Sequence, residues 1–110
     1  MASTEQMYQC KISGYNIKFI IIDNNNAYMH TINTDYLNYK LLLLLLKRAI
    51  DDLKSKQIKY IIQSVYIEEY NDMLKNRTSW IIHKQYFDNT CDIICQIDDY
   101  LENFGVGIGL

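Results

Sequence analysis

The sequence predicts a single α+β domain, residues 1–110, built around a mixed, mainly antiparallel sheet. The chain has 110 residues, 49% of them hydrophobic and 22% charged, which suits one globular core. Short β-favouring runs bounded by turn residues lie near both ends, and a long Leu-rich segment lies between them. The expected order is β-β-β-α-β-α-β-β, with residues 1–6 and 105–110 as flexible tails.

The first three strands are expected to form a meander. Residues 8–22 are rich in Ile, Tyr and Phe and are interrupted by Gly14-Tyr15-Asn16, which predicts two strands joined by a tight turn. The Asp-Asn-Asn-Asn run at 23–26 favours a second turn, because Asx side chains bond to their own backbone. A third strand is expected at residues 27–33.

A helix is expected over residues 36–56, where the sequence contains no Gly or Pro. Thr34 or Asp35 would cap its first turn by accepting a bond from an unpaired backbone amide. Six consecutive leucines, 41–46, are too few to cross a bilayer, which needs about 20 apolar residues. They place apolar side chains all round the helix, so we expect the sheet to cover one side and another element or a partner to cover the other.

The second half of the chain predicts a strand at residues 59–65, which makes the helix a crossover between the third and fourth strands. A short helix is expected at 68–76, a hairpin from strands at 80–87 and 91–98, and a final helical turn at 98–104. Cys91, Ile93, Cys95 and Ile97 alternate with polar residues, as in a half-buried strand. Ile94 is the one departure from this alternation.

Charge and cysteine content restrict the classes of function. The formal net charge of −2 provides no broad positive field, so nucleic-acid binding is not expected, although Lys54, Lys56 and Lys59 leave a local basic patch as a weaker option. Three cysteines without a C-x-x-C spacing, and an N-terminus unlike a secretion signal, predict an intracellular protein that keeps its thiols reduced. The abundance of Ile, Asn, Tyr and Lys is typical of an AT-rich genome, such as that of a large DNA virus.

Two segments carry a resemblance to a known family. LLKRAIDDLKSKQIKYI (residues 45–61) resembles the central helix and following strand of the GCN5-related N-acetyltransferase superfamily, and SWIIHKQY (79–86) is similar to the opening of its penultimate strand. The predicted order of elements resembles the C-terminal core of that fold. This resemblance implies acetyl-CoA as cofactor and N-acyl transfer as activity.

The resemblance also indicates where the cofactor would bind. In that family the pyrophosphate lies on backbone amides of a Gly-rich turn at the start of the central helix. The corresponding residues here are Tyr36, Leu37, Asn38, Tyr39 and Lys40. No glycine lies between residues 35 and 43, and only Lys40 offers a positive charge. We therefore expect a non-catalytic protein-interaction or structural module without a cofactor, binding a protein partner or itself; the alternative is an acyl-CoA-dependent N-acyltransferase.

The remaining candidate residues favour structural interpretations. His30 and His83 lack a Cys or carboxylate at metal-binding spacing, so no metal site is expected. Cys91 and Cys95 are interpreted as buried packing, although a Cys nucleophile with a distant His base stays open, and no catalytic residue is assigned. The Gly-rich segment 105–109 has no helix after it to complete a phosphate loop, but it could pair as an extended strand with another sheet.

Overall fold

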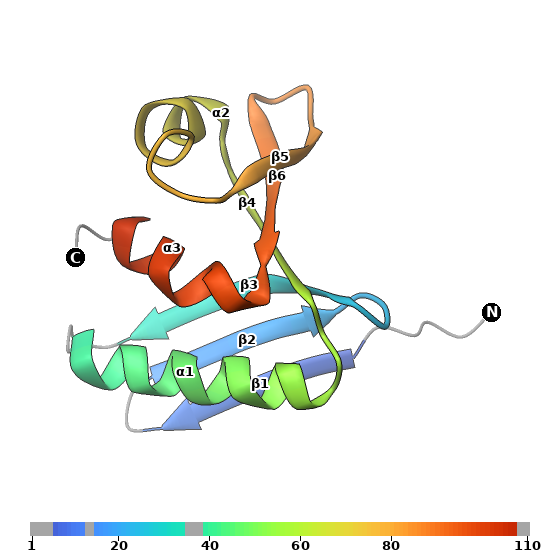
Figure 1. Cartoon of the computed structure of the whole chain (residues 1–110), viewed down its shortest axis with the longest axis vertical. Coiled ribbons are helices and arrows are strands. Elements are labelled where there is room, and N and C mark those ends of the chain that lie inside the picture. Colours follow the sequence, from blue (N-terminus) through green and yellow to red (C-terminus); the bar gives the residue numbers. More distant parts are fainter. Residues whose placement is uncertain (1–5, 13–14, 35–38, 108–110) are drawn as a thin grey trace.

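The computed structural model describes residues 6–12, 15–34 and 39–107, and it confirms the α+β class (Figure 1). Six strands form one mixed sheet in the order β1-β2-β3-β4-β6-β5. The strands are β1 (Gln6–Ile12), β2 (Tyr15–Ile21), β3 (Asn26–Thr34), β4 (Tyr60–Tyr66), β5 (Ile81–Gln85) and β6 (Thr90–Gln96). The helical segments are α1 (Tyr39–Ser55), α2 (Ile67–Glu69), the π-helical turn η1 (Tyr70–Leu74), the 3-10 turn η2 (Ile97–Asp99) and α3 (Tyr100–Gly107).

The predicted meander is confirmed, since β1, β2 and β3 pair antiparallel in sequence order. The turn from β2 to β3 is closed by Asp23, whose carboxylate Oδ1 accepts the backbone amides of Asn25 (2.8 Å) and Asn26 (3.0 Å). These bonds lower the pKa of Asp23 because they favour its ionised form, and the bond from Asn25 has the largest effect. The Asx run therefore forms a turn for the reason that its composition suggested.

A left-handed residue that is not glycine follows the end of α1. Gln57 has a φ of 69°, and its amide donates to the carbonyl of Lys54 (2.9 Å). The amide of Ile58 donates to the carbonyl of Leu53 (3.1 Å), which completes a Schellman motif. A side chain with a Cβ is strained in this region of backbone space, where glycine is not.

Replacing Gln57 by Gly should therefore stabilise the protein by about 0.5–1 kcal/mol, because relief of the left-handed strain exceeds the added freedom of the unfolded chain. Thermal unfolding followed by circular dichroism would show the gain as a higher Tm. The matched control is Asn89→Gly. Asn89 also has a positive φ (64°), but Asn tolerates this conformation, so a smaller gain is expected. Equal gains at both positions would contradict the strain argument.

The parallel pair β3–β4 confirms the predicted crossover through α1, but it is short. Only three residue pairs join these strands, from Asn26 with Tyr60 to Tyr28 with Ile62. β4 and β6, by comparison, are aligned over seven pairs. The β1–β3 half and the β4–β6 half of the sheet consequently diverge beyond this contact, as Figure 1 shows.

One hydrophobic core joins the sheet to the helices. It contains Phe19 of β2, Ile93 of β6 and the leucines of α1 that face the sheet, with Tyr70, Trp80 and Tyr100 from the second half. Within the leucine run, Leu42, Leu45 and Leu46 are buried, whereas the side chain of Leu44 is 64% exposed. α3 packs beside α1. An element of the same chain therefore covers part of the side of the Leu-rich helix that the sheet leaves open.

The later elements differ from expectation in detail. The helix predicted at 68–76 is split into α2 and η1, and the final helix extends to Gly107 instead of ending at Phe104. The terminal segments expected as tails overlap regular structure, because β1 begins at Gln6 and α3 includes residues 105–107. The hairpin of β5 and β6 is confirmed, with an irregular register between Ile82 and Lys84.

Candidate functional site: the open face of the sheet

One row of apolar residues crosses all six strands on the face of the sheet opposite the helices. The strand registers align Met7 with Ile20, Ile20 with Tyr28, Tyr28 with Ile62, Ile62 with Ile94, and Ile94 with Ile81. Aligned residues of neighbouring strands project to the same side. With strands about 4.8 Å apart, the row is roughly 24 Å long. We call it the open-face row.

The burial pattern shows that this row is separate from the main core. Phe19, Ile61 and Ile93, on the other face, pack with residues of α1, η1 and α3. Ile62, at the centre of the row, is buried but does not belong to that cluster. At the two ends, Met7 is 55% and Ile81 61% exposed. The row is therefore an apolar surface that the described helices leave uncovered.

Further aromatic residues extend this surface. Tyr60 and Tyr66 of β4 lie on the same face as Ile62, two and four residues away along the strand, and both are exposed. The hydroxyl of Tyr86 donates to Asp92 Oδ2 (2.6 Å), a bond that raises the pKa of Tyr86. Aromatic side chains with a polar end are common at protein interfaces, because they bury a large area while keeping a hydrogen bond.

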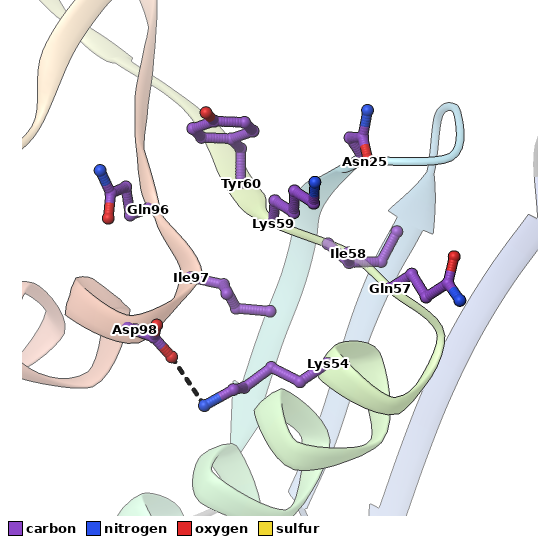
Figure 2. Close-up of a pocket in the computed structure, with 9 residues that line it drawn as sticks. All are labelled: Asn25, Lys54, Gln57, Ile58, Lys59, Tyr60, Gln96, Ile97 and Asp98. Atoms are coloured by element: carbon purple, nitrogen blue, oxygen red, sulfur yellow. Dashed lines mark ion pairs between the residues drawn. The ribbon is translucent and has the colours of Figure 1, made fainter.

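A polar recess lies at the end of the sheet where β4 begins and β6 ends (Figure 2). Its volume is about 630 Å³, and it is lined by Asn25, Lys54, Gln57, Ile58, Lys59, Tyr60, Gln96, Ile97 and Asp98. Lys54 Nζ lies 2.6 Å from Asp98 Oδ1, and this contact raises the pKa of Lys54. Both side chains are exposed, so the pair adds little stability. The amide and ammonium groups suit recognition by hydrogen bonds.

A second recess of about 300 Å³ shares Tyr60 and Gln96 with the first and also contacts Ile81 and Ile94 of the open-face row. Ser79, which also lines this recess, is held by the buried side chain of Asn103: Asn103 Nδ2 donates to Ser79 Oγ (2.8 Å), and the Ser79 amide donates to Asn103 Oδ1 (3.2 Å). These bonds tie the segment before β5 to α3. The two recesses and the row thus form one continuous surface around Tyr60.

The buried thiols are poor nucleophiles in this setting. Burial raises the pKa of Cys95 to about 12 and also raises the pKa of Cys91, so both are protonated at neutral pH. Both lie in the core on the helix-covered face of β6, and their predicted packing role agrees with this placement. Within residues 6–12, 15–34 and 39–107, no group of three His, Cys, Asp or Glu side chains is placed to hold a metal.

The five residues predicted to contact a cofactor lie at or before the start of α1 in the sequence. Tyr36, Leu37 and Asn38 lie outside the described residues, and Tyr39 is placed only as the first residue of α1. Lys40 is exposed and lines a groove between α1 and α3, together with Leu43, Leu44, Lys47, Leu101 and Glu102. The cofactor-binding role of residues 36–40 stays a prediction.

The fold and surface together define a small α+β domain whose mixed sheet carries helices on one face and an apolar row on the other. No protein-family model, curated protein or solved structure matches this chain. The resemblance to the acetyltransferase superfamily therefore stays a prediction. The described part of the chain contains no helix long and apolar enough to cross a membrane.

Proposed function

We propose that this chain is a non-catalytic protein-interaction module whose open sheet face binds an apolar layer of a protein partner. The observation that carries the proposal is the open-face row, which extends across every strand. A sheet that is apolar on both faces is stable in water when a second layer covers each face, as in three-layer domains. In this chain the helices supply one layer, and a partner would supply the other.

The exposed ends of the row favour a partner over simple internal packing. Met7 and Ile81 lie on β1 and β5, the two edge strands, and each is more than half exposed. Because each is already partly buried, covering the rest on binding contributes about 1–2 kcal/mol each before the costs of association. Tyr60 and the polar recess beside it would supply the hydrogen-bonding rim that surrounds the apolar centre of an interface.

The proposal is tested with a photo-crosslinking amino acid at Tyr60, introduced in the cells that naturally express the chain. We expect a covalent adduct with a defined protein, because Tyr60 is exposed beside the row. The second substitution Ile81→Lys should reduce the adduct yield about tenfold or more, since it places a charge in the apolar contact. Mass spectrometry of the adduct identifies the partner.

Two controls make this result specific. A crosslinker at Lys75, which is exposed at the end of η1, should give no such adduct. Met73→Lys, a change of the same chemistry on the helical side, should leave the yield from Tyr60 unchanged. Equal adducts from positions 60 and 75 would refute the proposal. Calorimetric titration with acetyl-CoA tests the acyltransferase alternative, and specific micromolar binding would replace our proposal with it.

A further inference from the structure

The turn between β5 and β6 presents the most exposed large hydrophobic side chain of the described residues. Phe87 has a relative exposure of 109%, so none of its ring is covered by the rest of the chain. The turn that holds it is well bonded: the Tyr86 amide donates to the Thr90 carbonyl (2.9 Å), and the Thr90 amide donates to Asp88 Oδ1 (3.2 Å). An aromatic ring on a fixed turn loses little freedom on binding.

The groove between α1 and α3 is a hollow, whereas Phe87 protrudes from the surface. Its volume is about 590 Å³, and its apolar lining comes from Leu43 and Leu44 of α1 and Leu101 of α3. Lys40 and Lys47 lie on the α1 side, two helical turns or about 10 Å apart, with Leu44 between them in sequence. An aromatic side chain fits this volume and would cover the exposed Leu44.

The charges beside the ring and the groove are complementary. Asp88 follows Phe87, and the hydrogen bond from the Thr90 hydroxyl lowers its pKa, so it is ionised at neutral pH. It is opposite in sign to Lys40 and Lys47. On the other side of the turn, Lys84 lies over the Tyr86 ring, 5.2 Å from its centroid, and the α3 side of the groove carries Glu102. Each side of the groove thus has a charge of opposite sign nearby, Asp88 on the turn for the lysines and Lys84 at the end of β5 for Glu102.

We propose that this chain associates with itself head to tail, with Phe87 of one copy inserted into the α1–α3 groove of a second copy. Figure 1 shows the β5–β6 turn well separated from the start of α1, so the two surfaces do not meet within one chain. Such a contact is heterologous, because each added copy keeps one free turn and one free groove. Association therefore continues beyond the dimer, and its two contact elements, Phe87 and the α1–α3 groove, do not belong to the open-face row.

Complementary variants test this inference by analytical ultracentrifugation across a wide concentration range. All are made in the Ile81→Lys chain, so that association through the open face does not contribute. The Ile81→Lys chain should form a concentration-dependent series of oligomers. Phe87→Ala removes the ring, and Leu44→Glu places a carboxylate in the groove between two lysines, where it also supports the helix. Each variant alone should associate at least about 30-fold more weakly, as expected for a central aromatic contact.

The decisive sample is the mixture of the two variants. Phe87→Ala keeps an intact groove and Leu44→Glu keeps an intact ring, so together they should form a single dimer of two 13.1 kDa chains and nothing larger. Asp88→Asn, which keeps the turn's hydrogen bonds but removes the charge, should weaken association, whereas Met73→Ala should not. A monomeric Ile81→Lys chain, unchanged association in either variant, or a mixture without dimer would each overturn the inference.

Discussion

Tyr100→Phe is expected to stabilise the protein by about 1–3 kcal/mol, whereas Tyr100→Ala should destabilise it by about 3–5 kcal/mol. The side chain is fully buried, and its hydroxyl has no hydrogen-bond partner within the described residues. Removing only the oxygen relieves that desolvation cost. Removing the ring also eliminates its contacts with Phe19, Trp80 and Phe104, whose centroids lie 6.0–6.2 Å away.

Urea unfolding of the three proteins measures both effects. The opposite signs separate the cost of the polar atom from the value of the packing, which a single alanine variant would combine. Phe104→Leu serves as a control, because it changes the edge of the same aromatic cluster without touching the buried hydroxyl. A loss of stability in Tyr100→Phe would show that the hydroxyl has a polar partner in solution.

The second large effect is a loss of stability at alkaline pH. Burial raises the pKa of Cys95 from 9.0 to about 12, so between these values the unfolded thiol ionises while the folded one does not. The folded state holds the proton more tightly, and its advantage, complete below pH 9, is lost as the pH rises toward 12. At about 1.4 kcal/mol per pKa unit, the loss reaches about 4 kcal/mol at most. Burial raises the pKa of Tyr100 as well, with the same sign.

Unfolding free energies measured in steps across this range test the linkage. Cys95→Val keeps the apolar volume but cannot ionise, so its stability should fall less steeply above pH 9. Tyr100→Phe should flatten the curve further, since it removes another buried group that titrates, while Cys91, whose pKa burial also raises, keeps part of the slope in both variants. If the unfolding free energy of all variants fell equally steeply above pH 9, other groups would be responsible for the loss of stability at alkaline pH.

Much of the fold follows from local sequence pattern. The absence of Gly and Pro from residues 36–56 predicted α1, and the Asx run predicted the turn from β2 to β3. The burial of Cys91, Ile93 and Cys95 followed from their alternation. The unequal burial of the leucines did not follow from the run itself, because Leu44 and Leu45 have the same chemistry. Leu45 lies on the face of α1 that packs into the core, whereas Leu44 lies on an exposed part of the helix.

The open-face row could not be read from the sequence, because each strand contributes a single residue to it. Its members are aligned by five strand registers, including the parallel one between β3 and β4, and register depends on tertiary contacts. One local signal was present: Ile94 interrupts the polar alternation of β6, and the structure places it in the row. The functional inference from the missing glycines stays a prediction, since it concerns residues that are mostly outside the described part of the chain.

The brief β3–β4 contact has a mechanical consequence. Its three aligned pairs are fewer than the four between β5 and β6 and the seven in each of the other ladders, so a pulling force applied across the sheet would open it first along this contact. The two halves would then remain connected by the covalent chain through α1 and by side-chain packing on the helical side. A ligand that spans this contact on the uncovered face would act as a clamp and fix the angle between the halves.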